Sequence, residues 1–263
     1  MHNLVEESFA YIPSGKYLLA AMIGTPKVSD RLTVPTVVLC HGFGGTKTEV
    51  CRHFVRLANK LVHKGCVTVR FDFAGFGDSV APSTAFSISQ AVDDIRAVVE
   101  YIKDRNIGSV ENLGILGFSF GGLIAAYAVG AGLPFKSACL VSAVERFIPP
   151  KETQPASRQN ENSECDSEPF HRGFLLSHKF VDEFLSCNGS SRLAASSIPV
   201  QLIHGTDDQT VPVDHAHNYA SAINTGSFAP VFIDGGDHAY SDRTFQRQLD
   251  QRVVAFFSDT LSI

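Results

Sequence analysis

Short apolar runs, each long enough for one strand, recur along the chain and are separated by helix-type patterns. The runs are almost continuously hydrophobic rather than alternating, which is typical of strands covered on both faces. This order predicts a mostly parallel, doubly wound α/β sheet that binds ligands beyond the carboxyl ends of its strands. Residues 8–13 and 16–24 flank a Ser-Gly turn and predict a leading hairpin. The later strands are expected at 34–40, 66–73, 112–118, 137–143, 198–204 and 229–234.

Two amphipathic patterns between these runs predict helices. Apolar residues fall on one helical face over 50–61 and again over 88–102. Before each pattern, a Ser or Thr is followed three residues later by Glu or Gln, which is the spacing of a capping box at a helix start. The pairs are Thr46 with Glu49 and Ser87 with Gln90.

One segment, 145–197, interrupts the alternation of strands and helices. Its first part, 149–169, is polar and loop-like, and the alternative interpretation of that part is a disordered surface loop. Its second part regains a helical pattern that we expect to pack over the carboxyl edge of the sheet. We interpret 145–197 as an inserted cap, and 1–144 with 198–263 as one core domain. The apolar face of the inserted part contains Phe174, Leu175, Phe180, Phe184 and Leu185.

Composition and charge argue against several classes of protein. With 263 residues and 44% hydrophobic composition, the chain can bury the core of one large α/β domain. The net charge is −5, and no block of Lys and Arg suggests a nucleic-acid partner. No apolar run approaches the ~18 residues of a membrane span, and no basic leader opens the chain. We therefore expect a cytoplasmic protein without a nucleic-acid partner or a membrane span.

The cysteines argue against a disulfide framework and against a zinc site. All 6 are scattered without a CxxC pair. Cys40, Cys66 and Cys139 fall within apolar runs, so we expect buried, reduced thiols.

Ser119 stands in the sequence GFSFGG, between an apolar run and a helix of small residues. This strand-turn-helix setting predicts a nucleophile elbow, in which the serine has a strained backbone conformation. Gly117 and Gly121 are then required because larger side chains would collide there. The alternative is an ordinary glycine-rich turn between a strand and a helix.

A serine nucleophile needs a base and an orienting carboxylate. His238 follows the last strand and is our candidate base, because its loop leaves the same sheet edge as Ser119. Two adjacent acids follow the preceding strand; the glycine three residues earlier favours Asp208, whereas Asp207 is the residue expected to cap the turn. Asp237 directly precedes the histidine and is expected to point away from its ring.

Acyl transfer also needs donors for the developing oxyanion, and backbone amides are suited to this. We expect these from Phe120, which opens a helix, and from Phe43 in the sequence CHGFGG. The following GFGGTKT is not a phosphate loop, because Thr46 stands where that motif has a glycine. No strand is followed by GxGxxG, and the chemistry requires neither a metal nor an organic cofactor.

The motifs CHGFGG, VRFDFAGFGDS, GFSFGG, LIHGTDDQTVP and GGDHAYSD, in this order, resemble the α/β-hydrolase superfamily. The resemblance is strongest to its bacterial cinnamoyl and feruloyl esterase-like members, and it spans roughly 30–258. It implies an α/β-hydrolase fold with a small inserted cap, and a triad of Ser119, Asp208 and His238. It also implies an oxyanion hole made by the amides of Phe43 and Phe120. In VRFDFAGFGDS we expect Asp72 and its neighbouring glycines to be structural.

The resemblance implies a serine carboxylesterase that forms an acyl-enzyme, with small esters, including hydroxycinnamoyl esters, as substrates. The inserted segment contains no tyrosine to grip a phenolic ring, so we expect simple aliphatic or aryl esters as much as hydroxycinnamoyl esters. We assign substrate binding to His41, Gly42, Phe174, Leu175 and Phe180. Thioesterase, lipase and peptidase-like activities use the same triad, and an inactive hydrolase-fold binding protein is the alternative from another class. A homodimer is compatible with the sequence, which does not define the oligomeric state.

Overall fold

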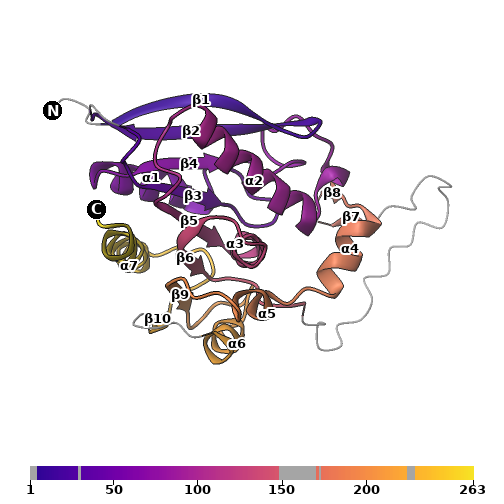
Figure 1. The fold of residues 1–263 in the computed structure, drawn as a ribbon. Coiled ribbons are helices and arrows are strands. Elements are labelled where there is room, and N and C mark those ends of the chain that lie inside the picture. The colour runs from indigo at the N-terminus through magenta and orange to yellow at the C-terminus, as the bar shows by residue number, and fades with distance from the viewer. Residues whose placement is uncertain (1–4, 29–30, 148–169, 172, 224–228) are drawn as a thin grey trace, which may run out of the picture.

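The computed structural model describes residues 5–28, 31–147, 170–171, 173–223 and 229–263. An eight-stranded sheet in the order β1-β2-β4-β3-β5-β6-β9-β10 forms the centre of the molecule (Figure 1). Its strands are β1 (Val5–Ser14), β2 (Tyr17–Pro26), β3 (Thr36–Cys40), β4 (Val67–Phe71), β5 (Leu113–Phe118), β6 (Phe135–Val141), β9 (Val200–Gly205) and β10 (Val231–Ile233).

The strand directions confirm the predicted sheet. β1 and β2 form the leading antiparallel hairpin, and β2 is antiparallel to β4. From β4 through β3, β5, β6 and β9 to β10, neighbouring strands are parallel. The loops that follow β3, β5, β9 and β10 therefore leave the sheet at one edge.

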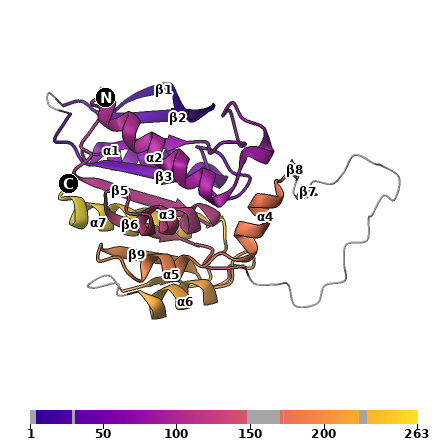
Figure 2. The same ribbon diagram turned by 45° about the vertical axis from the view of Figure 1, so that its right-hand side comes forward.

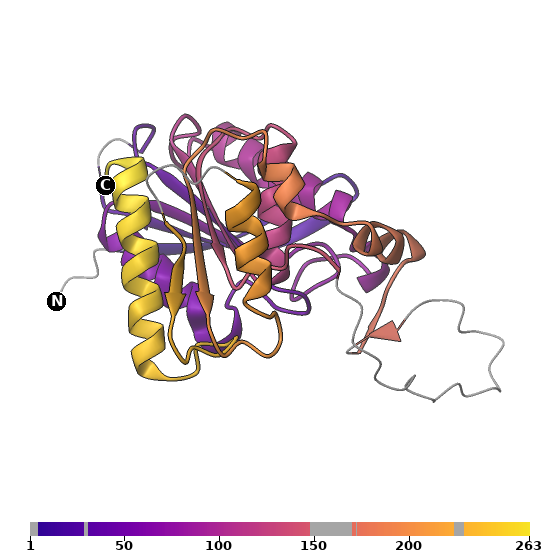
Figure 3. The same ribbon diagram turned by 90° about the horizontal axis from the view of Figure 1, so that it is seen from below.

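Helices cover both faces of the sheet, as the apolar strands require. One apolar core lies beneath α1 and α7, and the other lies beneath α2, α3 and α6. Figure 3 shows α6 and α7 on opposite sides of β9 and β10. The helices are α1 (His53–His63), α2 (Ile88–Asp104), α3 (Phe120–Gly130), α6 (Asp214–Ala222) and α7 (Arg243–Leu261), with short turns η1 (Val50–Arg52) and η2 (Ser83–Ala85).

The two expected helix starts differ in outcome. The Ser87 hydroxyl accepts the amide hydrogen of Gln90 at 3.1 Å and begins α2, although the Gln90 side chain bonds Asp94 rather than completing the box. The expected box of Thr46 and Glu49 does not form. Instead the Glu49 carboxylate accepts the amides of Gly42 and Val50, and α1 begins only at His53. Spacing alone does not reveal that the Gly42 amide, earlier in the same loop, competes for this carboxylate.

The described part of the inserted segment contains β7 (Phe170–His171), β8 (Phe174–Leu175), α4 (His178–Leu185) and α5 (Gly189–Leu193). The polar stretch 149–169 lies outside the described residues. Figures 1, 2 and 3 all show α4 at the end of the molecule opposite the C-terminus. The amide and hydroxyl of Ser89 donate to Glu183 of α4, at 3.0 and 2.7 Å, and attach this helix to the start of α2.

Cys40, Cys66 and Cys139 are buried free thiols, as expected for residues inside the strands and their packing. Burial raises the pKa of the Cys66 thiol to about 12. These side chains therefore act as small apolar groups in the core.

Three buried histidines, His41, His53 and His215, are held in their neutral form. Burial lowers the pKa of each one below its ordinary value. In each ring, one nitrogen accepts a hydrogen bond, so protonation would remove that acceptor. The donors are the Phe73 amide to His41 (3.0 Å), the Arg56 guanidinium to His53 (2.7 Å) and the Glu145 amide to His215 (3.0 Å).

We expect the free energy of unfolding to fall as the pH drops from about 7 to 5. The unfolded histidines take up protons near pH ~6.5 and the folded ones at lower pH, so acid favours the unfolded chain. The slope approaches about 1.4 kcal/mol per pH unit for each histidine that remains neutral. Chemical denaturation at several pH values measures it. His215→Gln should reduce the slope and the exposed control His63→Gln should not; equal stabilities at pH 7 and 5 would contradict the account.

Candidate active site

Ser119 lies on a sharp turn between β5 and α3, as the sequence predicts for an elbow. Its φ of 55° and ψ of −121° are strained for a residue with a side chain. The neighbouring positions have no room for a side chain and therefore require glycine. A Cβ on Gly121 would lie 2.1 Å from the Cys40 carbonyl oxygen. A Cβ on Gly117 would lie 2.3 Å from the Gly121 carbonyl oxygen. The turn therefore presents the serine hydroxyl at the carboxyl edge of the sheet.

His238 lies between Ser119 and Asp208 and contacts both. Its Nδ1 is 2.6 Å from Oδ2 of Asp208, and its Nε2 is 3.1 Å from Oγ of Ser119. When Nδ1–H donates to the carboxylate, Nε2 is free to accept the proton of the hydroxyl. This geometry is suited to general-base activation of the serine.

Asp208 is buried and held from several directions. Its Oδ1 accepts the amides of Thr210 and Val211, at 2.9 and 2.8 Å. On the other side, Nε2 of His204 is 2.8 Å from the Val211 carbonyl and 3.4 Å from Oδ2 of Asp208. Burial raises the pKa of Asp208, but the His204 and His238 contacts and the Val211 amide outweigh burial and hold that pKa well below its usual range. The carboxylate is thus fixed in its ionised form.

The two other acids do not reach the imidazole of His238. Asp207 is exposed, and its carboxylate accepts the Thr206 hydroxyl at 3.5 Å. Asp237 accepts the amide and hydroxyl of Ser241, both at 2.7 Å. Asp208 both caps the turn and contacts the histidine, whereas the sequence interpretation gave the capping role to Asp207.

The loop after β3 fixes the peptide that joins Gly42 to Phe43. The Gly42 carbonyl accepts Nδ1–H of His41 at 2.7 Å and the amide of Gly45 at 3.0 Å. In a trans peptide the N–H points opposite to the C=O, so the Phe43 amide points away from both donors. The Gly42 backbone lies against the nucleophile turn, since a Cβ on Gly42 would be 3.2 Å from Cβ of Ser119.

The second candidate oxyanion donor is the amide of Phe120. This residue opens α3, and the first amides of a helix have no acceptor inside the helix. The positive end of the helix dipole adds to this donor. The amides of Phe43 and Phe120 are therefore the two candidate donors of an oxyanion hole.

A cavity of about 870 Å³ opens beside Ser119 and His238. Its described walls are largely apolar and come from the β3 loop, the nucleophile turn and α4. The aromatic side chains on these walls are Phe43, Phe118, Phe120, Phe147, Phe180 and Phe184.

Only two of the five expected substrate-binding residues line this cavity, namely Gly42 and Phe180. His41 is buried beneath the loop, where both ring nitrogens are bonded to backbone. Phe174 packs outside the loop, 3.2 Å from where a Cβ of Gly44 would lie. Leu175 is exposed, and its carbonyl accepts the hydroxyl of Ser83. The apolar pattern of the inserted segment did not distinguish the side chains that face the sheet from those that face the cavity.

Sequence analysis missed Glu49 and Phe118 as cavity residues. Phe118 directly precedes the nucleophile, so its place at the strand end was an available signal. Glu49 was assigned to a helix cap, and no sequence pattern indicated its bond to Gly42.

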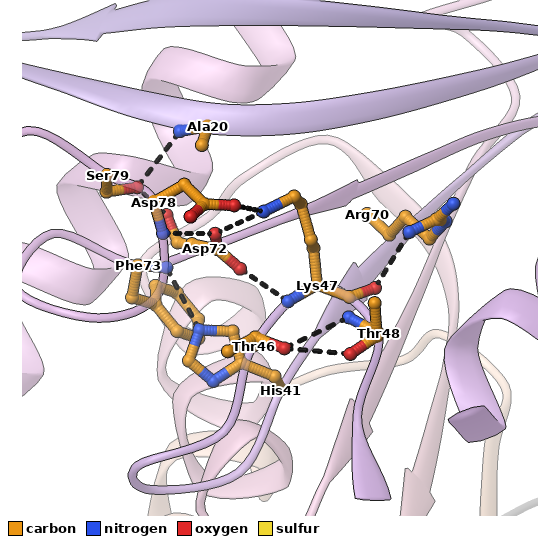
Figure 4. A network of polar contacts seen from close by, with 10 residues as sticks. All are labelled: Ala20, His41, Thr46, Lys47, Thr48, Arg70, Asp72, Phe73, Asp78 and Ser79. Atoms are coloured by element: carbon orange, nitrogen blue, oxygen red, sulfur yellow. Dashed lines mark hydrogen bonds and ion pairs between the residues drawn. The ribbon is translucent and has the colours of Figure 1, made fainter. Parts of the chain in front are cut away.

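Asp72 forms the centre of a buried polar network under the β3 loop (Figure 4). It accepts the amides of Lys47 and Asp78 and pairs with Nζ of Lys47 at 2.7 Å. Asp78 binds the same ammonium group. Gly77 has φ of 55°, and a Cβ there would lie 2.3 Å from the Asp72 carboxyl group. The structural role expected for this motif is confirmed, since these contacts join the turn after β4 to the loop that carries Phe43.

We expect Lys47→Met to lower the free energy of unfolding by roughly 3 kcal/mol, because it leaves the buried Asp72 carboxylate without its cation. Urea denaturation measures the loss. Lys64→Met, which removes an exposed ammonium, is the matched control and should change stability by less than about 0.5 kcal/mol. Equal stabilities of the two variants would show that the network does not stabilise the fold.

The described residues show no group of three or more His, Cys, Asp or Glu side chains placed to hold a metal ion. Within the same ranges, no helix is long and apolar enough to cross a membrane.

The strand order of the sheet and the sharp turn at Ser119 are those expected of the α/β-hydrolase fold. A family profile described as alpha/beta hydrolase fold matches residues 35–162. The chain has this fold over its described core.

Known relatives are similar over part or most of the chain. The uncharacterized protein YfhR of Salmonella typhimurium is 26% identical over 259 residues, which cover 94% of this chain and 80% of that protein. An uncharacterized 31.7 kDa protein from the traX-finO intergenic region of Escherichia coli is 30% identical over 88 residues, 34% of this chain and only 30% of its own length. Among solved structures, Est1E from Butyrivibrio proteoclasticus with bound ferulic acid has a TM-score of 0.80 at 22% identity, covering 97% of this chain and 100% of that one.

Proposed function

We propose that the protein is a serine-dependent carboxylic ester hydrolase that works through an acyl-enzyme. The observation that carries this proposal is the continuous hydrogen-bonded series from Asp208 through His238 to Ser119, at 2.6 and 3.1 Å. A strained nucleophile turn and two candidate oxyanion amides beside the same hydroxyl support it. A binding protein on an inactive hydrolase fold would not need this combination.

In the proposed reaction, the Ser119 hydroxyl attacks the ester carbonyl while Nε2 of His238 takes its proton. The amides of Phe43 and Phe120 stabilise the oxyanion of the tetrahedral intermediate. Asp208 holds the imidazole in its reactive tautomer and stabilises the imidazolium. The imidazolium then protonates the leaving alcohol, and water attacks the acyl-enzyme by the same route to release the acid.

The cavity supports an apolar acyl or aryl ester as substrate. Its aromatic walls favour the burial of hydrocarbon, which contributes about 0.8 kcal/mol for each buried CH₂. We propose that 145–197 acts as the cap of this cavity, because Phe180 and Phe184 of α4 form part of the wall. The ferulic acid bound to Est1E makes hydroxycinnamoyl esters one candidate within this class.

Hydrolysis rates for 4-nitrophenyl esters of two to twelve acyl carbons, together with methyl ferulate, test the proposal. We expect kcat/KM to rise from acetate to medium chain lengths as the acyl group fills the apolar cavity. A clear preference for methyl ferulate would assign the enzyme to hydroxycinnamoyl esters. No turnover of any of these esters would contradict the proposed ester hydrolysis.

A further inference from the structure

Glu49 is a carboxylate in a largely apolar cavity, and neither the triad nor the oxyanion hole uses it. It is 9% exposed and accepts the amide of Gly42 at 2.7 Å and that of Val50 at 2.8 Å. Within the described chain, no Lys, Arg or His forms an ion pair with it. Its negative charge is therefore not neutralised by a neighbouring side chain.

The carboxylate lies close to the reacting centre. A Cβ built on Gly42 would be 3.2 Å from Cβ of Ser119 and 3.6 Å from Oε2 of Glu49. Cβ of Ser119 and Oε2 of Glu49 are therefore no more than about 7 Å apart. Gly45 also lies against this carboxylate, because a Cβ on Gly45 would be only 3.1 Å from Oε2 of Glu49. A substrate bound at Ser119 is thus within reach of the field of this charge.

The backbone around Glu49 is strained. Glu49 has φ of 58° and ψ of 165°, and Cys51 and Arg52 also have positive φ. Such conformations cost of order 1–3 kcal/mol each and persist where the surroundings enforce them, often beside functional sites. An ordinary helix start, which the sequence pattern predicted, would have placed this carboxylate away from Gly42.

The described residues that line the cavity include no cationic side chain that would neutralise the charge of Glu49. Among the described lining residues there is no Lys or Arg, and the two histidines are His171 and the triad residue His238. Aromatic walls with one carboxylate and no fixed cation disfavour an anionic substrate and favour a cationic one, because ring faces attract cations.

We propose that Glu49 determines the charge preference of the site, which selects esters with a neutral or cationic acyl group and rejects those with a carboxylate. This inference rests on the proposed ester hydrolysis and narrows its substrate class. At about 7 Å and an intermediate dielectric, one charge changes the binding of another on the order of 10-fold.

The test uses 4-nitrophenyl esters whose acyl chains share four methylenes and differ only in the last group. Those groups are isopropyl and carboxylate, which have similar shape, and tert-butyl and trimethylammonium, which form a second such pair. In the wild-type enzyme, we expect kcat/KM for the trimethylammonium ester to exceed that for the carboxylate ester by at least about 10-fold. Equal or reversed rates would overturn the proposal, even without a variant.

Glu49→Gln removes the charge and keeps an oxygen that can accept the Gly42 amide. We expect the cation-to-anion ratio of kcat/KM to fall by at least about 10-fold in this variant, while Glu111→Gln, an exposed carboxylate, leaves the ratio unchanged. If Glu49 only held the loop, all four esters would slow alike and the ratio would stay constant, which rejects the inference. Failure of the proposed function is a separate result, because the isopropyl and tert-butyl esters would then not turn over either.

Discussion

Replacing Ser119 with alanine is expected to lower kcat on an activated 4-nitrophenyl ester by about 10⁴ to 10⁶-fold. The hydroxyl is the only group within hydrogen-bonding distance of Nε2 of His238, among the described residues, that can act as nucleophile. What activity remains would come from binding and the oxyanion amides alone. Steady-state kinetics at saturating ester measures the change.

The fold should survive this substitution, which separates chemistry from stability. Alanine has the same φ penalty as serine at 55°, so the strain of the turn is unchanged. The melting temperature of Ser119→Ala is therefore expected to lie within a few degrees of the wild type. Substantial turnover by a folded Ser119→Ala protein would mean that another group carries the reaction.

The second large effect is expected at Asp208. Asp208→Asn should lower kcat by about 10⁴-fold, because an amide cannot hold the imidazole in the required tautomer or stabilise its charged form. The neighbouring Asp207→Asn is the matched control, since that side chain is exposed and does not contact His238. It should retain near-normal kcat.

The opposite result would be a strongly reduced kcat for Asp207→Asn and a near-normal kcat for Asp208→Asn. That result would make Asp207 the acid of the triad. The pair also tests the charge of Asp208, whose pKa is held well below its usual range. Because that carboxylate is ionised throughout the neutral range, we expect the activity of the wild-type enzyme to show no titration of Asp208 above pH 5.

The sheet was predictable because buried parallel strands must be apolar on both faces. The run at 112–118 became β5 (Leu113–Phe118), and 198–204 became β9 (Val200–Gly205). Chain order and the shared sheet edge then brought Ser119 and His238 together. These features depend on local pattern and on the geometry of parallel sheets, both of which one sequence contains.

The remaining features depend on contacts that the spacing of residues does not define. The spacing of Thr46 and Glu49 resembled a helix cap, but the free amide of Gly42 competes successfully for the Glu49 carboxylate. His41 was expected to bind substrate, yet burial and two backbone bonds make it a support for the loop. Local spacing cannot rank such competitors, because their free energies depend on which groups the fold brings together.

Labelling with a fluorophosphonate, followed by mass spectrometry of the modified peptide, tests the central claim most directly. Such reagents react with a serine that a neighbouring histidine activates, and the adduct mimics the tetrahedral intermediate. We expect stoichiometric modification at Ser119 in the wild-type protein and none in Ser119→Ala or His238→Ala. Absence of labelling at Ser119 in the folded wild-type protein, or labelling of another serine instead, would contradict the proposed triad.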